Sequence, residues 1–199
     1  MIGCECATCR SADPRDNRLR PSIFVQTAAD VAVRASTNIL VDAGPDLRAQ
    51  ALRHGVTRVD AILFTHGHAD HILGIDDVRR FNATMAQPMP CYGDRLTLDD
   101  IRKTFHYVFD RNTPKGGGLP KLDLLPIDGP LKLGDLDVQP IPLWHGARPV
   151  LGFRFDRFAY LTDCNRIDED AWPLLEDLLY ELRMRFVQAQ QGEKRIIEP

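Results

Sequence analysis

Short apolar runs separated by polar and turn-forming residues fill the first third of the chain. Runs of this kind predict β-strands at 21–28, 37–41 and 60–65, with 31–33 as a candidate partner strand. The apolar spacing over 46–54 instead predicts a helix. It should end at Gly55, because glycine readily takes the left-handed conformation of a helix C-cap.

The rest of the chain mixes strands and helices without strict alternation. Helical periodicity extends over 72–81, 97–109 and 169–191. Strands are predicted at 89–92, at 131–133 and 136–138 around a Gly-Asp turn, and at 152–155 and 158–162 around an Asp-Arg turn. In the last predicted helix, an apolar stripe runs from Trp172 to Phe186. This stripe would cover part of a sheet or pair with a second copy of the chain, which leaves a homodimer open.

Length, composition and net charge limit the classes of function that this protein can have. A length of 199 residues suits one domain with a hydrophobic core. The net charge of −3 and a pI near 6.1 argue against non-specific binding to nucleic acid. No apolar stretch approaches the roughly 20 residues that span a bilayer, and the N-terminus lacks the pattern of a signal peptide. We therefore expect a cytoplasmic protein whose partner is neither a membrane nor nucleic acid.

The clearest chemistry follows the predicted strand at 60–65. Positions 65–71 read THGHADH, which places three of the six histidines and one aspartate within six residues. His66, His68 and Asp70 are spaced two apart, and because no helical face joins such positions, a loop must fold them toward one point. Imidazole and carboxylate are the usual protein ligands of zinc and also suit manganese. Together with His71, these groups are enough to begin two metal sites.

A second cluster lies at the N-terminus, where Cys4, Cys6 and Cys9 form a C-x-C-x-x-C motif. In a chain without an export signal, this spacing favours metal ligation over disulfide formation. Three thiolates supply most of a tetrahedral structural zinc site, which needs a fourth ligand from elsewhere. The alternative is three reduced thiols at the surface.

Two later positions repeat the geometry of the histidine loop. An apolar run at 140–144 ends at His145, and another at 160–162 leads into Asp163. Each places a ligand-type side chain where a predicted strand stops. Alone, His145 would be an ordinary loop residue and Asp163 a turn former. We interpret both residues as candidate metal ligands only because the histidine loop precedes them.

In this order, the H-x-H-x-D-H loop, the strand-end histidine and the strand-end aspartate resemble the metallo-β-lactamase superfamily. Within it, the chain is similar to the phosphoribosyl cyclic phosphodiesterases of phosphonate degradation. Further motifs that carry this similarity are GCECATCRS at 3–11, RLRPS at 18–22, ILVDAGPD at 39–46 and YLTD at 160–163. The resemblance implies an αββα sandwich of mixed α/β class. It covers about 3–176 and leaves 177–199 as a divergent helical tail.

The resemblance also implies a two-metal centre of zinc or manganese ions. The implied ligands are His66, His68 and His145 for one ion, Asp70 and His71 for the other, and Asp163 as a bridge. Two cations about 3.5–4 Å apart acidify a bridging water and stabilise the attacking and leaving oxygens at phosphorus. Asp70 would in addition orient the resulting hydroxide. The three N-terminal cysteines would match the family's separate structural zinc site.

The chain departs from that family at both ends, so the resemblance implies a sandwich that is incomplete there. Relatives begin with a strand and a Gly-Thr-Gly loop before the cysteine cluster. After the position of Glu176 they carry a histidine that protonates the leaving group and two more that complete the metal sites. Here no histidine follows His145. Loss of general acid catalysis typically lowers the rate by about 10²–10⁴-fold.

Three hypotheses of function follow. The first is a hydrolase that cleaves small cyclic or linear phosphodiesters. The second is a metal-binding remnant with little or no catalysis, which would hold one ion at most. The third is a nuclease like those that process tRNA 3′ ends, which share the histidine loop. Against the third, the sequence offers no candidate for an RNA-binding arm, and the net charge is negative.

Overall fold

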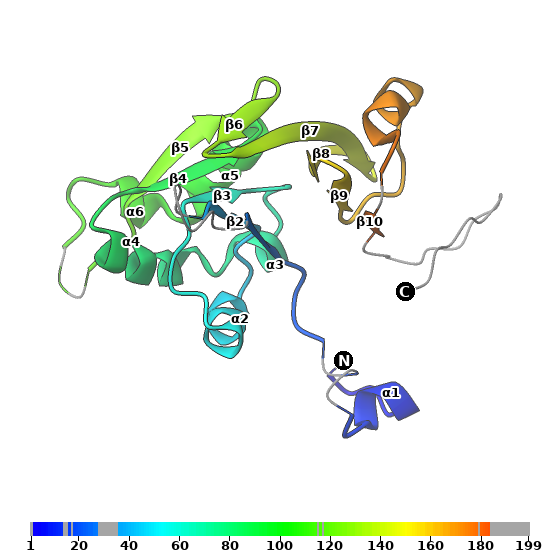
Figure 1. Ribbon diagram of the computed structural model, residues 1–199. Helices are drawn as coiled ribbons and strands as arrows, with labels where there is room; N and C mark the ends of the chain where they lie inside the picture. The colour runs from blue at the N-terminus through cyan, green and yellow to red at the C-terminus, as the bar shows by residue number, and fades with distance from the viewer. Residues whose placement is uncertain are drawn as a thin grey trace.

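Two five-stranded β-sheets organise the computed structural model of this protein (Figure 1). The structure describes residues 2–13, 16, 18–27, 36–114, 116, 118–178 and 180–183. The first sheet contains, in spatial order, β1 (Ile23–Gln26), β2 (Asn38–Val41), β3 (Ala61–Leu63), β4 (Met89–Gly93) and β5 (Leu122–Pro126). Strands β2 to β5 are parallel, and β1 is antiparallel to β2.

The second sheet is mostly antiparallel. It contains, in spatial order, β10 (Tyr180–Arg183), β9 (Phe158–Leu161), β8 (Arg148–Phe155), β7 (Leu136–His145) and β6 (Leu131–Leu133). Strand β10 runs parallel to β9, whereas the other neighbours are antiparallel. The two hairpins expected around Gly134 and Asp156 are therefore confirmed as β6–β7 and β8–β9.

Successive side chains on β2 and β3 point to opposite sides and show what each face of the first sheet packs against. Ile39, Val41 and Leu63 pack in one buried cluster with residues of the second sheet. Leu40 and Ile62 point the other way, into a second cluster that is filled by helices. Successive side chains of a strand face opposite sides, so a fully apolar strand is buried on both of its faces. The first sheet is consequently an inner layer, between helices and the second sheet.

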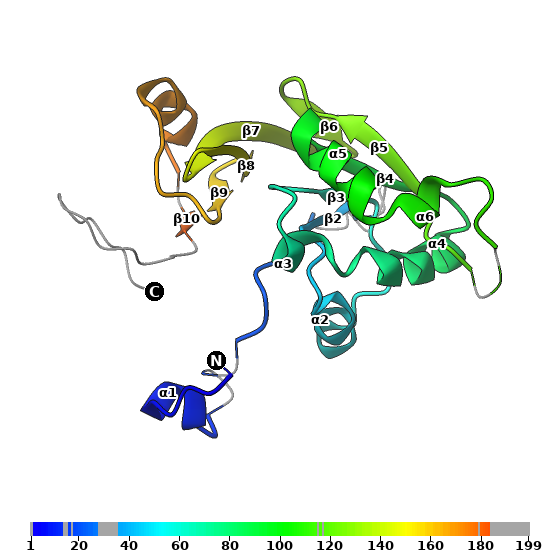
Figure 2. The same cartoon turned by 180° about the vertical axis from the view of Figure 1, so that it is seen from behind.

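Helices form the two outer layers (Figures 1 and 2). On the first sheet lie α2 (Leu47–His54), α3 (Ala69–Ile72), η2 (Ile75–Val78), α4 (Arg79–Met85), α5 (Arg95–Thr104) and α6 (His106–Phe109). On the second sheet lies η3 (Glu169–Leu175), whose Ala171 packs against Ile141 and Leu161. The αββα sandwich is thereby confirmed. Helix α1 (Ala7–Arg10) lies apart from both sheets in the two views.

Most predicted elements form with small shifts of their ends, and α2 ends at Gly55 in the left-handed conformation as expected (φ 63°). The predicted helix 72–81 is instead divided among α3, η2 and α4. Gly74 lies at the break, where an added Cβ would be 2.0 Å from the carbonyl oxygen of Gly44. The chain turns there because its backbone packs directly against the backbone at Gly44. The candidate strand at 31–33 lies outside the described residues.

The prediction of one helix over 169–191 is wrong for the described residues of that range. The short 3₁₀ helix η3 contains Pro173 and is followed by a turn in which Asp177 has a positive φ of 58°. Residues 180–183 then form β10 beside β9, not part of a divergent helical tail. Backbone hydrogen bonds to the edge of a sheet outweigh helical periodicity, which is a weak preference. Residues 179 and 184–191 of that prediction, and the remainder of the predicted tail to 199, lie outside the described residues. In the described part of the chain, no helix is long and apolar enough to cross a membrane.

Candidate metal centre

Ligand-type side chains emerge where strands of both sheets end. His66 and His68 lie in the loop after β3, and His71 lies in α3. His145 is the last residue of β7, and Asp163 follows β9 by two residues. The structure brings all five together at one edge of the sandwich, as the family resemblance implied.

Three of the histidines form one group. The ring centroids of His66 and His68 are 4.5 Å apart, and those of His68 and His145 are 5.1 Å apart. One nitrogen from each of the three rings lies within 4.8 Å of the others. His66 is fully buried, whereas His68 is exposed. Solvent or a small molecule can therefore approach this group from the side of His68.

A second group shares His66 with the first. It joins His66 to His71 and Asp163, whose donor atoms also lie within 4.8 Å of one another. The Nε2 atom of His71 is 3.0 Å from Oδ2 of Asp163, and Nε2 of His66 is 3.8 Å from the same oxygen. Asp163 thus lies between the two histidines, and its backbone has a positive φ of 50°.

Asp42 contacts His71 on the side away from Asp163. The sequence analysis included it in the motif at 39–46 and gave it no role at the site. Its fully buried Oδ2 is 2.7 Å from Nδ1 of His71. The backbone N–H and the hydroxyl of Thr65 both donate to the same carboxylate, at 2.9 and 2.8 Å. Such outer partners fix the orientation of a metal-binding imidazole. Asp42 directly follows β2, so its position at a strand end was the available signal.

Burial keeps two of the histidines neutral. It lowers the pKa of His66 to about 3, with a further contribution from His71 and His68. It also lowers the pKa of His68, as do the nearby His145 and Arg148. Because only the neutral imidazole has a lone pair for a cation, both side chains are in the form that binds metal.

His71 behaves oppositely. Burial alone would lower its pKa, but the hydrogen bonds to Asp163 and Asp42 outweigh burial and raise the pKa to about 10. In Asp163, burial raises the carboxyl pKa, but His71 lowers it by more. A cation that binds at His71 must therefore displace a proton. Four imidazoles and one carboxylate nevertheless form a donor set that fits Zn²⁺ or Mn²⁺.

Asp70 lies next to His71 in α3 but belongs to neither close group. Its carboxylate accepts a hydrogen bond from Nη1 of Arg20 at 3.3 Å, and its side chain is 27% exposed. The sequence analysis predicted Asp70 as a ligand and did not anticipate Arg20 as its partner. The backbone N–H of Arg20 is itself held by Asp46, at 2.7 Å.

The sulfur atoms of Cys4, Cys6 and Cys9 also converge within 4.8 Å. All three belong to the N-terminal segment around α1, away from the sheets (Figure 1). Hydrogen bonds from the backbone of Cys9 and then from the thiol of Cys4 lower the pKa of Cys6 to about 7. The thiolate, which is the form that binds zinc, is therefore favoured at Cys6, whereas the pKa of Cys9 is raised.

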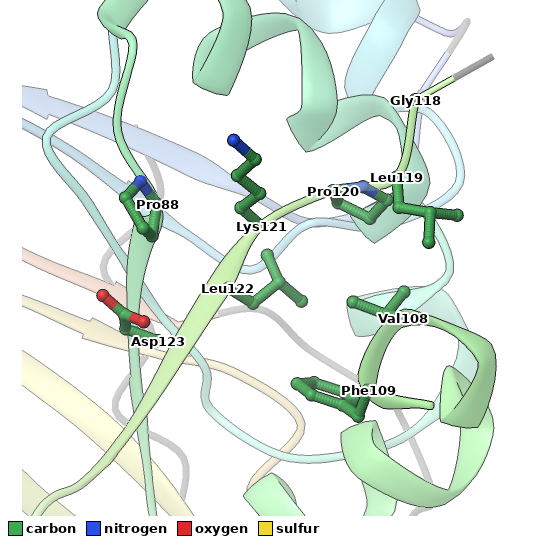
Figure 3. Close-up of a pocket in the computed structure, with 9 residues that line it drawn as sticks. All are labelled: Pro88, Val108, Phe109, Gly118, Leu119, Pro120, Lys121, Leu122 and Asp123. Carbon is green, nitrogen blue, oxygen red and sulfur yellow. The ribbon is translucent and has the colours of Figure 1, made fainter. Parts of the chain in front are cut away.

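A pocket of about 470 Å³ lies far from these groups (Figure 3). Its lining includes Val108 and Phe109 of α6, together with Leu119 and Leu122. Pro88 and Lys121 also line it, and each immediately precedes a parallel strand of the first sheet. The pocket is consequently at the amino ends of β4 and β5, opposite to the strand ends that carry the histidines.

Comparisons with known proteins place this centre in a family. Residues 37–191, more than half of the chain, match the model of the β-lactamase superfamily domain. An octanoyltransferase from Porphyromonas gingivalis is 39% identical over 166 residues, which are 83% of this chain but 32% of that protein. This chain thus spans about a third of that curated relative.

Two solved structures show the same architecture. A diphosphatase from the PhnP family is 36% identical with a TM-score of 0.77, and the match covers 90% of this chain and 66% of that one. Zn²⁺-bound PqqB from Methylobacterium extorquens is 21% identical with a TM-score of 0.62, over 91% of this chain and 66% of that one. The second likeness shows the fold alone. The match to the family model and the likeness to the PhnP-family structure agree with the motifs in the sequence, and the chain belongs to the metallo-β-lactamase superfamily.

Proposed function

We propose that this chain is a metal-dependent hydrolase that cleaves small cyclic or linear phosphodiesters. The observation that carries this proposal is the convergence of four imidazoles and Asp163 from both sheets at one edge of the fold. These donors are of the type that binds zinc or manganese at catalytic sites. Exposure of His68 gives a substrate access to the group.

The first group, His66, His68 and His145, would hold one ion, and His71 would hold the second, with Asp163 shared. Asp70 lies outside both groups and is assigned to the second ion from the family resemblance alone. Two bound cations would supply positive charge for the phosphoryl oxygens and lower the pKa of a water. Arg20 donates a hydrogen bond to Oδ2 of Asp70, which restrains the carboxylate that would bind the second ion.

The surrounding residues set the protonation of the centre. Asp42 accepts a hydrogen bond from Nδ1 of His71, which directs Nε2 toward Asp163, the residue that would be shared by the two ions. Thr65 donates to Asp42 and keeps that carboxylate from rotating. Burial of His66 excludes water from the inner side of the group. The outer side, at His68, is where a phosphodiester would enter.

Hydrolysis of bis(4-nitrophenyl) phosphate by the protein loaded with Mn²⁺ tests the proposal. We expect turnover by the wild type and a loss of about 100-fold or more in H68A, beyond the 10–100-fold typical for outer partners. H54A is the matched control, because His54 is an exposed histidine at the end of α2. Equal rates for wild type and H68A would contradict a role for this centre in hydrolysis.

A second candidate reaction is hydrolysis of a diphosphate bond, favoured by the diphosphatase at 36% identity. The same charges would serve either bond, because both reactions displace an oxygen at phosphorus. Phosphate release from a nucleoside diphosphate, compared with cleavage of a cyclic phosphodiester by the same preparation, separates the two. The larger kcat/KM identifies the preferred bond.

We also propose that Cys4, Cys6 and Cys9 hold a structural zinc ion. The convergence of three sulfur atoms and the lowered pKa of Cys6 support this site. In both views α1 lies apart from the sheets, so the cysteine site is separate from the proposed hydrolytic centre (Figures 1 and 2).

A further inference from the structure

An ion pair lies where the two sheets meet, beside the first histidine group. Arg148 is the first residue of β8, and Asp100 belongs to α5 on the first sheet. The Nη2 group of Arg148 donates to Oδ2 of Asp100. The two residues are 48 positions apart, so the contact depends on how the sheets are placed against each other.

Arg148 is tied to His145 by the register of the β7–β8 hairpin. The two residues are paired across the strands, with Gly146 and Ala147 as the turn between them. Directly opposite residues on neighbouring strands project to the same face, with their Cβ atoms about 4.5–5.5 Å apart. The guanidinium group therefore leaves the second sheet on the same side as the imidazole of His145.

Asp100 is tied to the histidine loop by close packing. A Cβ added to Gly67 would lie 2.7 Å from Cβ of Asp100 and 2.8 Å from its Oδ2. Gly67 is the residue between His66 and His68, so Asp100 rests against the backbone that connects these two side chains. Glycine is required there because the carboxylate occupies the space of a side chain.

The pair is partly shielded from solvent, so its charges are screened less than those of a surface pair. The side chains of Arg148 and Asp100 are 24% and 25% exposed. In contrast, the Arg95–Asp128 pair, with 75% and 70% exposure, is a surface contact of little energetic weight. The backbone N–H of Leu151 also crosses between the sheets here, donating to the carbonyl oxygen of Thr65 at 2.9 Å.

We propose that Asp100 and Arg148 are positioning residues that hold His145 at the correct distance from His66 and His68. The proposal rests on the proposed function, because it concerns the first metal site of that centre. His66 and His68 come from the first sheet and His145 from the second, so any shift between the sheets opens the site. Metal-binding side chains must be held within about 0.5 Å of their working geometry.

Titration of the metal-free protein with Mn²⁺ and Zn²⁺, without substrate, tests the proposal in D100N and R148Q. We expect each variant to bind the metal of the first site 10–100-fold more weakly, the usual effect of losing an outer partner. The double variant should be no weaker than either single variant, because both changes break one contact. R148K keeps the charge and should recover part of the affinity. D128N, which breaks the exposed pair, is the matched control and should bind like wild type.

The visible absorption spectrum of bound Co²⁺ provides a second readout that a general loss of stability would not change. We expect altered band positions in D100N and R148Q, because the geometry of the site changes, and wild-type bands in D128N. H145A separates this proposal from the proposed function. If H145A binds metal like wild type, the proposed centre itself is wrong. If H145A binds weakly while D100N and R148Q match wild type in affinity and spectrum, the positioning role is overturned.

Discussion

The histidine centre and the cysteine cluster are two candidate metal sites built in opposite ways. The histidine centre collects residues from positions 66 to 163, and three of its members are buried. The cysteine cluster draws all its members from positions 4 to 9, none of them buried, next to a helix of four residues. The first site is preorganised by the packing of two sheets, whereas the second depends on a short local segment.

This difference determines what each metal would contribute. A site that the fold has already shaped gains little further order on binding, so its ions would mainly supply charge for chemistry. A site in a short segment has no hydrophobic core beneath it, and metal binding there would itself supply folding free energy. The predictions below separate the two sites, from the largest expected effect to the smallest.

Replacement of Asp163 by asparagine should have the largest effect. Its Oδ2 lies between Nε2 of His71 and Nε2 of His66, so D163N would remove the negative charge that the two proposed ions share. We expect elemental analysis to find at least one ion fewer per chain. Hydrolysis should fall by more than about 100-fold, because loss of a residue that only orients a ligand typically costs about 10–100-fold. D123N, at an exposed position on β5, is the control. Unchanged metal content in D163N would exclude Asp163 as a shared ligand.

Replacement of Asp42 by asparagine should have the next largest effect. D42N leaves the fully buried His71 without its charged partner at Nδ1. Removing one member of a buried ion pair typically costs about 3–5 kcal/mol of stability. We expect a lower melting temperature of the metal-free protein and weaker binding of the second ion, measured by calorimetric titration. A melting temperature equal to that of wild type would show that the pair does not stabilise the fold.

The pH dependence of the metal-free protein should report on His71. Its pKa is raised from 6.5 to about 10, so its pairing with Asp163 and Asp42 stabilises the fold fully below pH 6.5. This stabilisation should be lost as the pH rises through 10. Chemical denaturation at several pH values should show the decline in wild type and not in H71Q. Affinity for the second ion should change in the other direction and increase with pH, because His71 loses its proton.

Replacement of Cys6 by serine should have the smallest effect on hydrolysis. C6S removes one of three thiols that lie apart from the sheets, so we expect one zinc ion fewer per chain and an unchanged kcat with Mn²⁺ at the histidine centre. Proteolysis of the N-terminal segment should become faster, because a bound ion would order this segment. A loss of hydrolysis equal to that of D163N would show that the two sites are coupled.

Local patterns in the sequence predicted most strands and the histidine loop, whereas the layered sandwich was implied by the resemblance to a known family. Apolar runs predicted β2 and β3, and the ends of β7 and β9 placed His145 and Asp163 near the loop of 65–71. Strand ends are informative because the strands of one sandwich share an edge. The role of these residues as ligands stays a prediction, which the metal titrations test.

Contacts between distant residues were not predictable in the same way. Asp42 contacts His71 across 29 positions, and Asp100 contacts Arg148 across 48. A single aspartate in a turn or a helix carries no pattern that names its partner. The prediction for 180–183 failed for a related reason. These residues form a strand because they pair with β9, which is a tertiary contact. Periodicity reports local preference, and these features depend on tertiary packing.

The backbone hydrogen bond from Leu151 to Thr65 has a consequence for measurement in solution. It belongs to neither sheet's own ladder, so its amide proton exchanges with solvent when the two sheets separate, even if each sheet stays intact. The exchange rate of this one amide, measured by NMR in deuterated water, therefore reports how often the two sheets separate. Slower exchange with each added equivalent of metal would show that the ions hold the two halves of the sandwich together.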